Sequence, residues 1–93
     1  MTYIKNFQTG YQQLTSLSAA TKLTVPAGTT FALISPESQA VRWRDDGVAP
    51  TATVGYPLPV GAELRYDAQQ IWEIQFIEQT ASAKLNVTYY GTL

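Results

Sequence analysis

The stretch WEIQFIEQTASAKLNVTYY, residues 72–90, decides the fold class of this chain. Apolar side chains alternate with polar or less apolar ones on both sides of a turn signal at residues 81–82. The alternating apolar residues are Trp72, Ile74 and Phe76 before the turn, and Leu85, Val87 and Tyr89 after it. Because side chains of an extended strand point to opposite faces in turn, each set shares one face. The stretch therefore predicts two half-buried strands that place Trp72 and its partners in a core.

The same period of two continues through the rest of the chain, and helical spacing is not sustained anywhere. Further pairs that share a face are Leu23 with Val25, Phe31 with Leu33, and Val41 with Trp43. Segments rich in Pro, Gly, Asp and Ser separate these pairs, as expected for turns; they lie at residues 26–28, 35–38, 45–47 and 59–61. The pattern predicts an all-β chain with seven or eight short strands.

A weak internal repeat refines this prediction. VPAGTTFAL (residues 25–33) and LPVGAELRY (residues 58–66) share Pro at the second position and Gly at the fourth. This spacing suits a type I turn that reverses the chain and begins a new strand. Two similar corners in one small sandwich suggest paired Greek keys. The expected fold is a single β-sandwich, jelly-roll-like, spanning residues 20–93.

Residues 1–19 differ from the rest of the chain. Their apolar side chains, Tyr3, Phe7 and Tyr11 among them, are diluted by Gln, Thr and Ser. Two interpretations stay open. The segment is either an edge strand of the sandwich or an arm that becomes ordered against a sister subunit or another protein.

The densest group of charges is AVRWRDDG, residues 40–47. Alternation places Arg42, Arg44 and Asp46 on one face, where two guanidinium groups could clamp a carboxylate of another copy. The same residues could also form an exposed strand face with ion pairs to Glu73 or Glu78. The loop expected at residues 48–59 contains three prolines and is a further candidate contact surface.

Several classes of function lose support from the composition. The 93 residues include no His and no Cys, which removes imidazole bases, thiolate nucleophiles and the usual ligands of zinc. We therefore expect no enzyme, no catalytic or metal-binding residue and no cofactor. The net charge of −1 provides too little positive field for a nucleic-acid partner, and no apolar run has the length of a membrane span.

A resemblance adds a functional expectation. The segments LTVPAGTTFALI (residues 23–34), AVRWRDDGVAPTATVGYPL (40–58) and IQFIEQTASAKLNVTYYG (74–91) resemble small proteins encoded among the head and structural genes of tailed bacteriophages. The resemblance implies a virion structural protein made in the bacterial cytoplasm and carried on the capsid surface. Its nearest known roles are capsid decoration or cement proteins and head fibres.

Proteins of this kind are often β-sandwich trimers, so the expected partners are two further copies of the chain and the major capsid protein or another virion protein. The alternative function is a carbohydrate-binding module of a phage adsorption apparatus, with Tyr56, Tyr66, Tyr89 or Tyr90 on an exposed platform. The candidate subunit or capsid contacts are Tyr3, Phe7, Tyr11, Arg42, Arg44, Asp46, Tyr56, Tyr66 and Tyr90.

Overall fold

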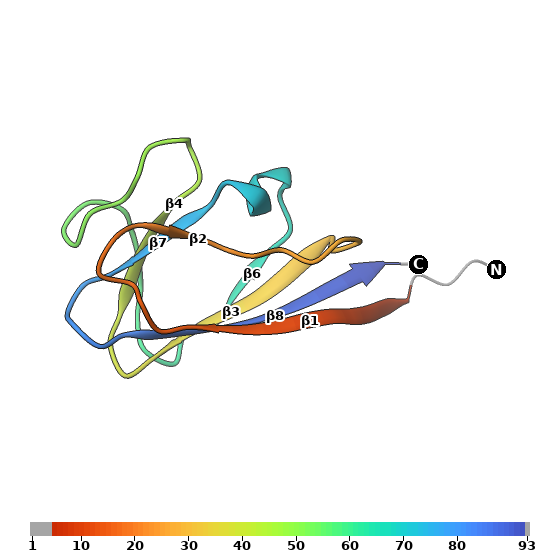
Figure 1. Ribbon diagram of the computed structural model, residues 1–93, viewed down its shortest axis with the longest axis horizontal. Coiled ribbons are helices and arrows are strands. Elements are labelled where there is room, and N and C mark those ends of the chain that lie inside the picture. Colours follow the sequence, from red (N-terminus) through yellow and green to blue (C-terminus); the bar gives the residue numbers. More distant parts are fainter. Residues whose placement is uncertain (1–4, 93) are drawn as a thin grey trace.

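The computed structural model describes residues 5–92, which form two four-stranded antiparallel sheets packed as a sandwich (Figure 1). The first sheet has the order β1-β8-β3-β6 and the second the order β2-β7-β4-β5. The strands are β1 (Asn6–Leu14), β2 (Thr21–Lys22), β3 (Phe31–Glu37), β4 (Val41–Arg44), β5 (Tyr56–Leu58), β6 (Leu64–Tyr66), β7 (Gln75–Glu78) and β8 (Lys84–Thr92). A short 3-10 helix, η1 (Gln69–Trp72), precedes β7.

The pairing of the strands is nested along the chain. β1 pairs with β8, β2 with β7, β3 with β6 and β4 with β5, as if one long hairpin had been folded over. The pairs β3–β8 and β4–β7 then join these hairpins into the two sheets. Eight strands wound in this way form a jelly roll. The prediction of an all-β, jelly-roll-like sandwich is confirmed.

The N-terminal strand is part of the first sheet. β1 is an edge strand, and its register with β8 runs from Asn6↔Thr92 to Leu14↔Leu85 with one irregularity between Gln8 and Gly10. Of the two forms expected for this segment, the described residues adopt the edge strand. Tyr3, one of the candidate contacts, lies outside the described residues.

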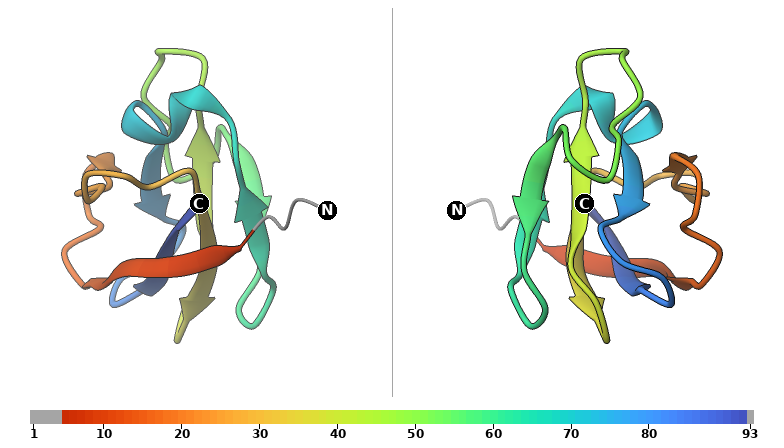
Figure 2. Two further views of the ribbon diagram at one scale, coloured as in Figure 1. Left: turned by 90° about the vertical axis from the view of Figure 1, so that its right-hand side faces the viewer. Right: turned by 90° about the vertical axis from the view of Figure 1, so that its left-hand side faces the viewer.

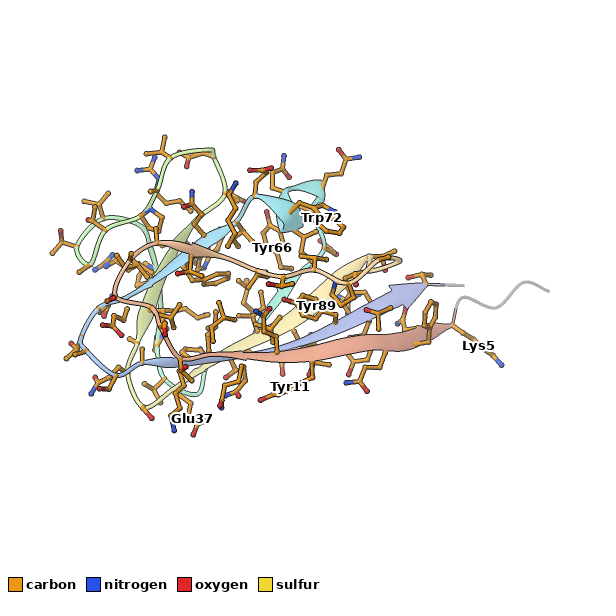
Figure 3. All side chains as sticks on the ribbon, in the orientation of Figure 1. Lys5, Tyr11, Glu37, Tyr66, Trp72 and Tyr89 are labelled. Carbon is orange, nitrogen blue, oxygen red and sulfur yellow. The ribbon has the colours of Figure 1, made fainter. Side chains whose placement is uncertain are left out.

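The core lies between the two sheets and draws on every strand except the short β2. Both halves of residues 72–90 contribute to it, through Ile74 and Phe76 before the turn and Leu85, Val87 and Tyr89 after it. Val41 and Ile34 are also fully buried. Figure 3 shows Tyr66 and Tyr89 lying in the space between the sheets. Continuous burial of alternating side chains is what holds a sandwich together.

Trp72 departs from its predicted position. The prediction that it shares a buried strand face with Ile74 is wrong, because residues 69–72 form a 3-10 turn and Trp72 is 52% exposed. The amide of Ile71 bonds to the carbonyl of Ala68, and this turn directs Ile71 into the core instead. The strand begins only at Gln75, so the period of two does not extend back to Trp72.

The face of β3 that meets the core is the opposite of the predicted one. Ala32 and Ile34 face the core, whereas Phe31 and Leu33 lie on the outer side of the sheet. Phe31 is nevertheless buried, because the ring of Tyr90 stacks on it at 5.0 Å and the guanidinium of Arg65 lies 3.8 Å from its centroid. A large apolar side chain on an outer face can be covered by its neighbours within the same sheet.

Two proline segments also differ from their expected roles. The turn predicted at residues 35–38 is shorter, because β3 continues through Pro36 to Glu37 and the chain turns at Ser38, where φ is 75°. The loop predicted at residues 48–59 contains β5 with Pro57 at its centre. Proline is tolerated there because β5 is an edge strand, where an amide facing away from the sheet is not needed for pairing.

Candidate functional site

The most distinctive surface of the molecule lies where β4 and β5 meet the loop between them. We call this surface the β4–β5 corner. It is a hollow of about 510 Å³ lined by Trp43, Arg44, Asp45, Asp46, Val54, Gly55, Tyr56 and Pro57. The candidate contacts Arg44, Asp46 and Tyr56 are therefore brought together with residues 54–57 of the loop expected at 48–59, whereas Arg42 does not line the hollow.

Two aromatic rings, those of Trp43 and Tyr56, line the β4–β5 corner. Trp43 and Tyr56 are direct partners across β4 and β5, and their ring centroids lie 5.2 Å apart at an angle of 36°. Tyr56 is 64% exposed, while Trp43 is half-buried. On its buried side Trp43 packs edge-to-face with Tyr66, and the centroids of the two rings lie 6.1 Å apart. The exposed ring of Tyr56 therefore stands on a packed aromatic base.

Within the described part of the chain, the buried Nε1 of Trp43 has no hydrogen-bond acceptor. An unmet buried donor costs about 1–3 kcal/mol. This cost offsets part of the stability that the indole gains by packing against Tyr56 and Tyr66.

Arg44 and Asp46 form an ion pair at the rim of the β4–β5 corner. Nε of Arg44 donates to Oδ1 of Asp46 at 3.0 Å, and Nη2 donates to Oδ2. These hydrogen bonds lower the pKa of Asp46 and raise the pKa of Arg44. The carboxylate that the arginine holds is thus in its own chain, two residues away, rather than on Glu73, which pairs with Lys22.

Arg42 holds the loop that carries the far side of the β4–β5 corner. Its Nη1 donates to the carbonyl of Gly55 at 2.8 Å and its Nε donates to the carbonyl of Ala52 at 3.2 Å. Gly55 has φ of 146°, and a Cβ there would lie 3.1 Å from Cβ of Arg42 and 3.2 Å from Cβ of Pro50. These hydrogen bonds therefore hold the loop against β4 in the isolated chain.

The two adjacent carboxylates have different roles. Asp45 accepts a hydrogen bond from the hydroxyl of Tyr66 at 2.6 Å, whereas Asp46 faces Arg44. Burial, followed by the hydrogen bond to Asp45, raises the pKa of Tyr66. Both carboxylates are thus occupied by partners within the chain. The arrangement suits binding through aromatic and apolar contacts better than acid–base chemistry.

The other candidate contacts lie on the first sheet, away from the β4–β5 corner. Tyr11 is 58% exposed on the outer face, where its hydroxyl donates to Oδ1 of Asn86 at 2.6 Å (Figure 3). Tyr90 is half-buried in its stack with Phe31, and Phe7, the second residue of β1, is exposed.

Tyr66 and Tyr89 are buried, so the prediction that they form an exposed platform is wrong for both. Tyr66 supports Trp43 from inside the sandwich. Trp43 was not among the candidate contacts, because its alternation with polar neighbours favoured a place in the core over an exposed stacking platform. Trp43 pairs with the exposed Tyr56 because of the register between β4 and β5. This pairing was not predicted, because residues 48–59 were expected to form a loop without a strand.

Among residues 5–92, no group of three or more Asp or Glu side chains is arranged to hold a metal ion. None of the helices in that range could cross a membrane.

Comparison with known proteins gives no match to the chain among protein-family models, curated proteins or solved structures.

Proposed function

We propose that this chain is a non-enzymatic structural protein of a tailed-phage virion, a decoration or cement protein on the capsid, and that it docks on the major capsid protein or another virion protein through the β4–β5 corner. The observation that carries the proposal is the hollow beside Trp43 and Tyr56, with exposed Val48 and Val54 on the adjoining loop. The resemblance of residues 23–34, 40–58 and 74–91 to phage structural proteins supplies the choice of partner.

The composition of the β4–β5 corner supports a protein partner. Trp, Tyr and Arg are the residue types that dominate the binding energy of protein interfaces, and they do so where they cluster in a well-packed patch. Here Trp43, Tyr56 and Arg44 lie around one hollow. Because Arg42 already holds the loop, docking costs little conformational entropy.

The test compares two valines of equal exposure. Val54 lines the β4–β5 corner and is 52% exposed, whereas Val60 lies in the turn after β5 and is 53% exposed. Val54→Asp should weaken binding to capsids stripped of their minor proteins by at least about tenfold, because it places an unpaired carboxylate in an apolar contact. Val60→Asp should bind as the parent chain does. Equal binding by the two variants would show that the β4–β5 corner is not the interface. If the parent chain itself does not bind stripped capsids, the proposed virion role is wrong.

A second function is favoured by one detail of the same surface. The exposed face of Tyr56 lies beside the ion pair of Arg44 and Asp46, and an aromatic ring next to charged hydrogen-bonding groups is a common arrangement for holding a sugar. The second candidate is therefore a carbohydrate-binding module of an adsorption apparatus. Calorimetric titration with host-surface glycans distinguishes it: heat that disappears in Tyr56→Ala supports this function, whereas the absence of heat from the parent chain excludes it for the glycans tested.

A further inference from the structure

Four strands form the edges of the two sheets, and they differ greatly in length. β2 has two residues, β5 and β6 have three each, and β1 has nine. β5 also contains Pro57, which lacks an amide hydrogen. Short strands and prolines protect sheet edges from pairing with other chains. β1 is therefore the long edge of this sandwich.

The open side of β1 has no backbone partner within residues 5–92. β1 pairs with β8 alone, and none of the hydrogen bonds outside the sheets reaches a backbone group of Asn6–Leu14. The neighbouring segment at residues 24–29 bonds only to side chains of β1: the hydroxyl of Thr29 bonds to the hydroxyl of Thr9, and the backbone amide of Thr24 donates to Oε1 of Gln12. An unpaired row of amides and carbonyls is a template for another strand.

The sequence of β1, NFQTGYQQL, lacks the other usual protection of an edge, because it contains no charged residue. It also carries two of the exposed large apolar side chains, Phe7 and Tyr11. The irregularity between Gln8 and Gly10 interrupts the strand near its beginning. From Gly10 to Leu14 the register with β8 is continuous, which leaves five regular residues for a new pairing.

We propose that β1 pairs antiparallel with β1 of a second copy about a two-fold axis through residues 10–14, which joins two first sheets into one continuous sheet of eight strands. A two-fold axis brings identical residues close together, so a charge near it would repel its own copy. Gln12 and Gln13 carry no charge, and the exposed side chain of Gln13 ends in an amide that both donates and accepts hydrogen bonds. The segment can therefore meet its own copy without charge repulsion.

The position of β1 leaves the β4–β5 corner free. Figure 2 shows the loop between β4 and β5 at the top of the molecule in both views, with β1 near the bottom. Pairing through β1 is therefore compatible with docking through the corner. The inference goes beyond the proposed function and does not depend on it, since it concerns only the purified chain.

The experiment measures the mass of the purified chain by sedimentation and light scattering up to high micromolar concentration. The expected species is a dimer. Gln13→Lys should weaken the dimer by at least about tenfold, because it places two like charges across the axis. The side chain of Gln13 is exposed and donates to Asn86, a bond that a lysine can also donate. Circular dichroism and the melting temperature should confirm that the variant remains folded.

Two controls separate strand pairing from general effects of charge. Val60→Lys places the same charge at an exposed position away from β1 and should leave the dimer intact. Gln13→Glu alone should also dissociate, while an equimolar mixture of Gln13→Lys and Gln13→Glu should form mixed dimers, because the charges then attract. A monomer at every concentration would overturn the proposal. So would the trimer expected from the phage resemblance, or a dimer that Gln13→Lys leaves unchanged.

Discussion

Replacing Tyr89 with phenylalanine should make the molecule less stable near neutral pH and equally stable or more stable in strong alkali. The side chain of Tyr89 is 1% exposed, and its hydroxyl donates to Oε1 of Gln12 at 2.6 Å. Burial raises the pKa of Tyr89 from its ordinary value to about 12. The folded chain therefore keeps the phenol neutral at a pH where the unfolded chain ionises it.

The magnitude follows from these two pKa values. Below about pH 10 the hydroxyl is neutral in both states, and Tyr89→Phe loses one hydrogen bond, about 1 kcal/mol. Gln12 keeps its second donor, the amide of Thr24, so its oxygen is not left alone. Above about pH 10 the unfolded parent chain releases a proton that the folded chain retains, which costs the parent about 1.4 kcal/mol by about pH 11. The phenylalanine variant does not have this cost.

Urea unfolding of both proteins at a series of pH values checks the reasoning. The difference in the free energy of unfolding should fall from about 1 kcal/mol at neutral pH, pass through zero between about pH 10 and about pH 11, and be reversed at higher pH. Other alkaline groups, the lysines and Tyr66 among them, affect both proteins alike and cancel in the difference. Parallel curves for the two proteins would show that the phenol ionises equally in both states, and would refute its burial.

Two further substitutions test local packing and the loop. Gly91→Ala would place a Cβ 2.5 Å from the carbonyl oxygen of Gly28 and 2.7 Å from Cζ of Phe7, so we expect a loss of about 1–3 kcal/mol and a melting temperature lower by at least about 4 °C. Adding Phe7→Leu should recover part of this loss, and an unchanged melting temperature in Gly91→Ala would contradict the contact. Arg42→Ala removes the two hydrogen bonds to the loop, so amide hydrogen exchange at residues 51–55 should become faster while exchange in β8 does not change; equal protection in variant and parent would show that the arginine does not hold the loop.

The period of two was sufficient to predict the fold class but not every face. Leu85, Val87 and Tyr89 are buried as predicted, because they lie on the long strand at the centre of the first sheet. On β3 the two faces also differ, yet the face that meets the core is that of Ala32 rather than that of Phe31. The period of two shows that the two faces of a strand differ in their hydrophobicity. Which face meets the opposite sheet depends on packing across the sandwich, and this is not encoded in one strand.

The residues of the candidate site were easier to identify than their partners. Alternation placed Arg42, Arg44 and Asp46 on one face, but the pairing of Arg44 with Asp46 of the same chain was not predicted; the expected partners were a carboxylate of another copy, Glu73 or Glu78. The bonds from Arg42 to the carbonyls of Ala52 and Gly55 could not be predicted, because they depend on the path of a loop. A guanidinium in a sequence shows that charge is present, but not whether the chain itself uses that charge.

The nested pairing of the strands has a consequence for the order in which the molecule folds. Arg42 and Gly55, which meet beside the β4–β5 pair, are 13 residues apart, whereas Asn6 and Thr92 at the outermost pair are 86 apart. Closing the longer separation first would cost about 1.7 kcal/mol more chain entropy than closing the shorter one.

If the inner hairpin forms first, each later pair has only a short additional length of chain to close. We therefore expect the folding nucleus at β4 and β5, with β1 joining last. Substitutions in the inner hairpin should slow folding, whereas those in β1 should mainly speed unfolding.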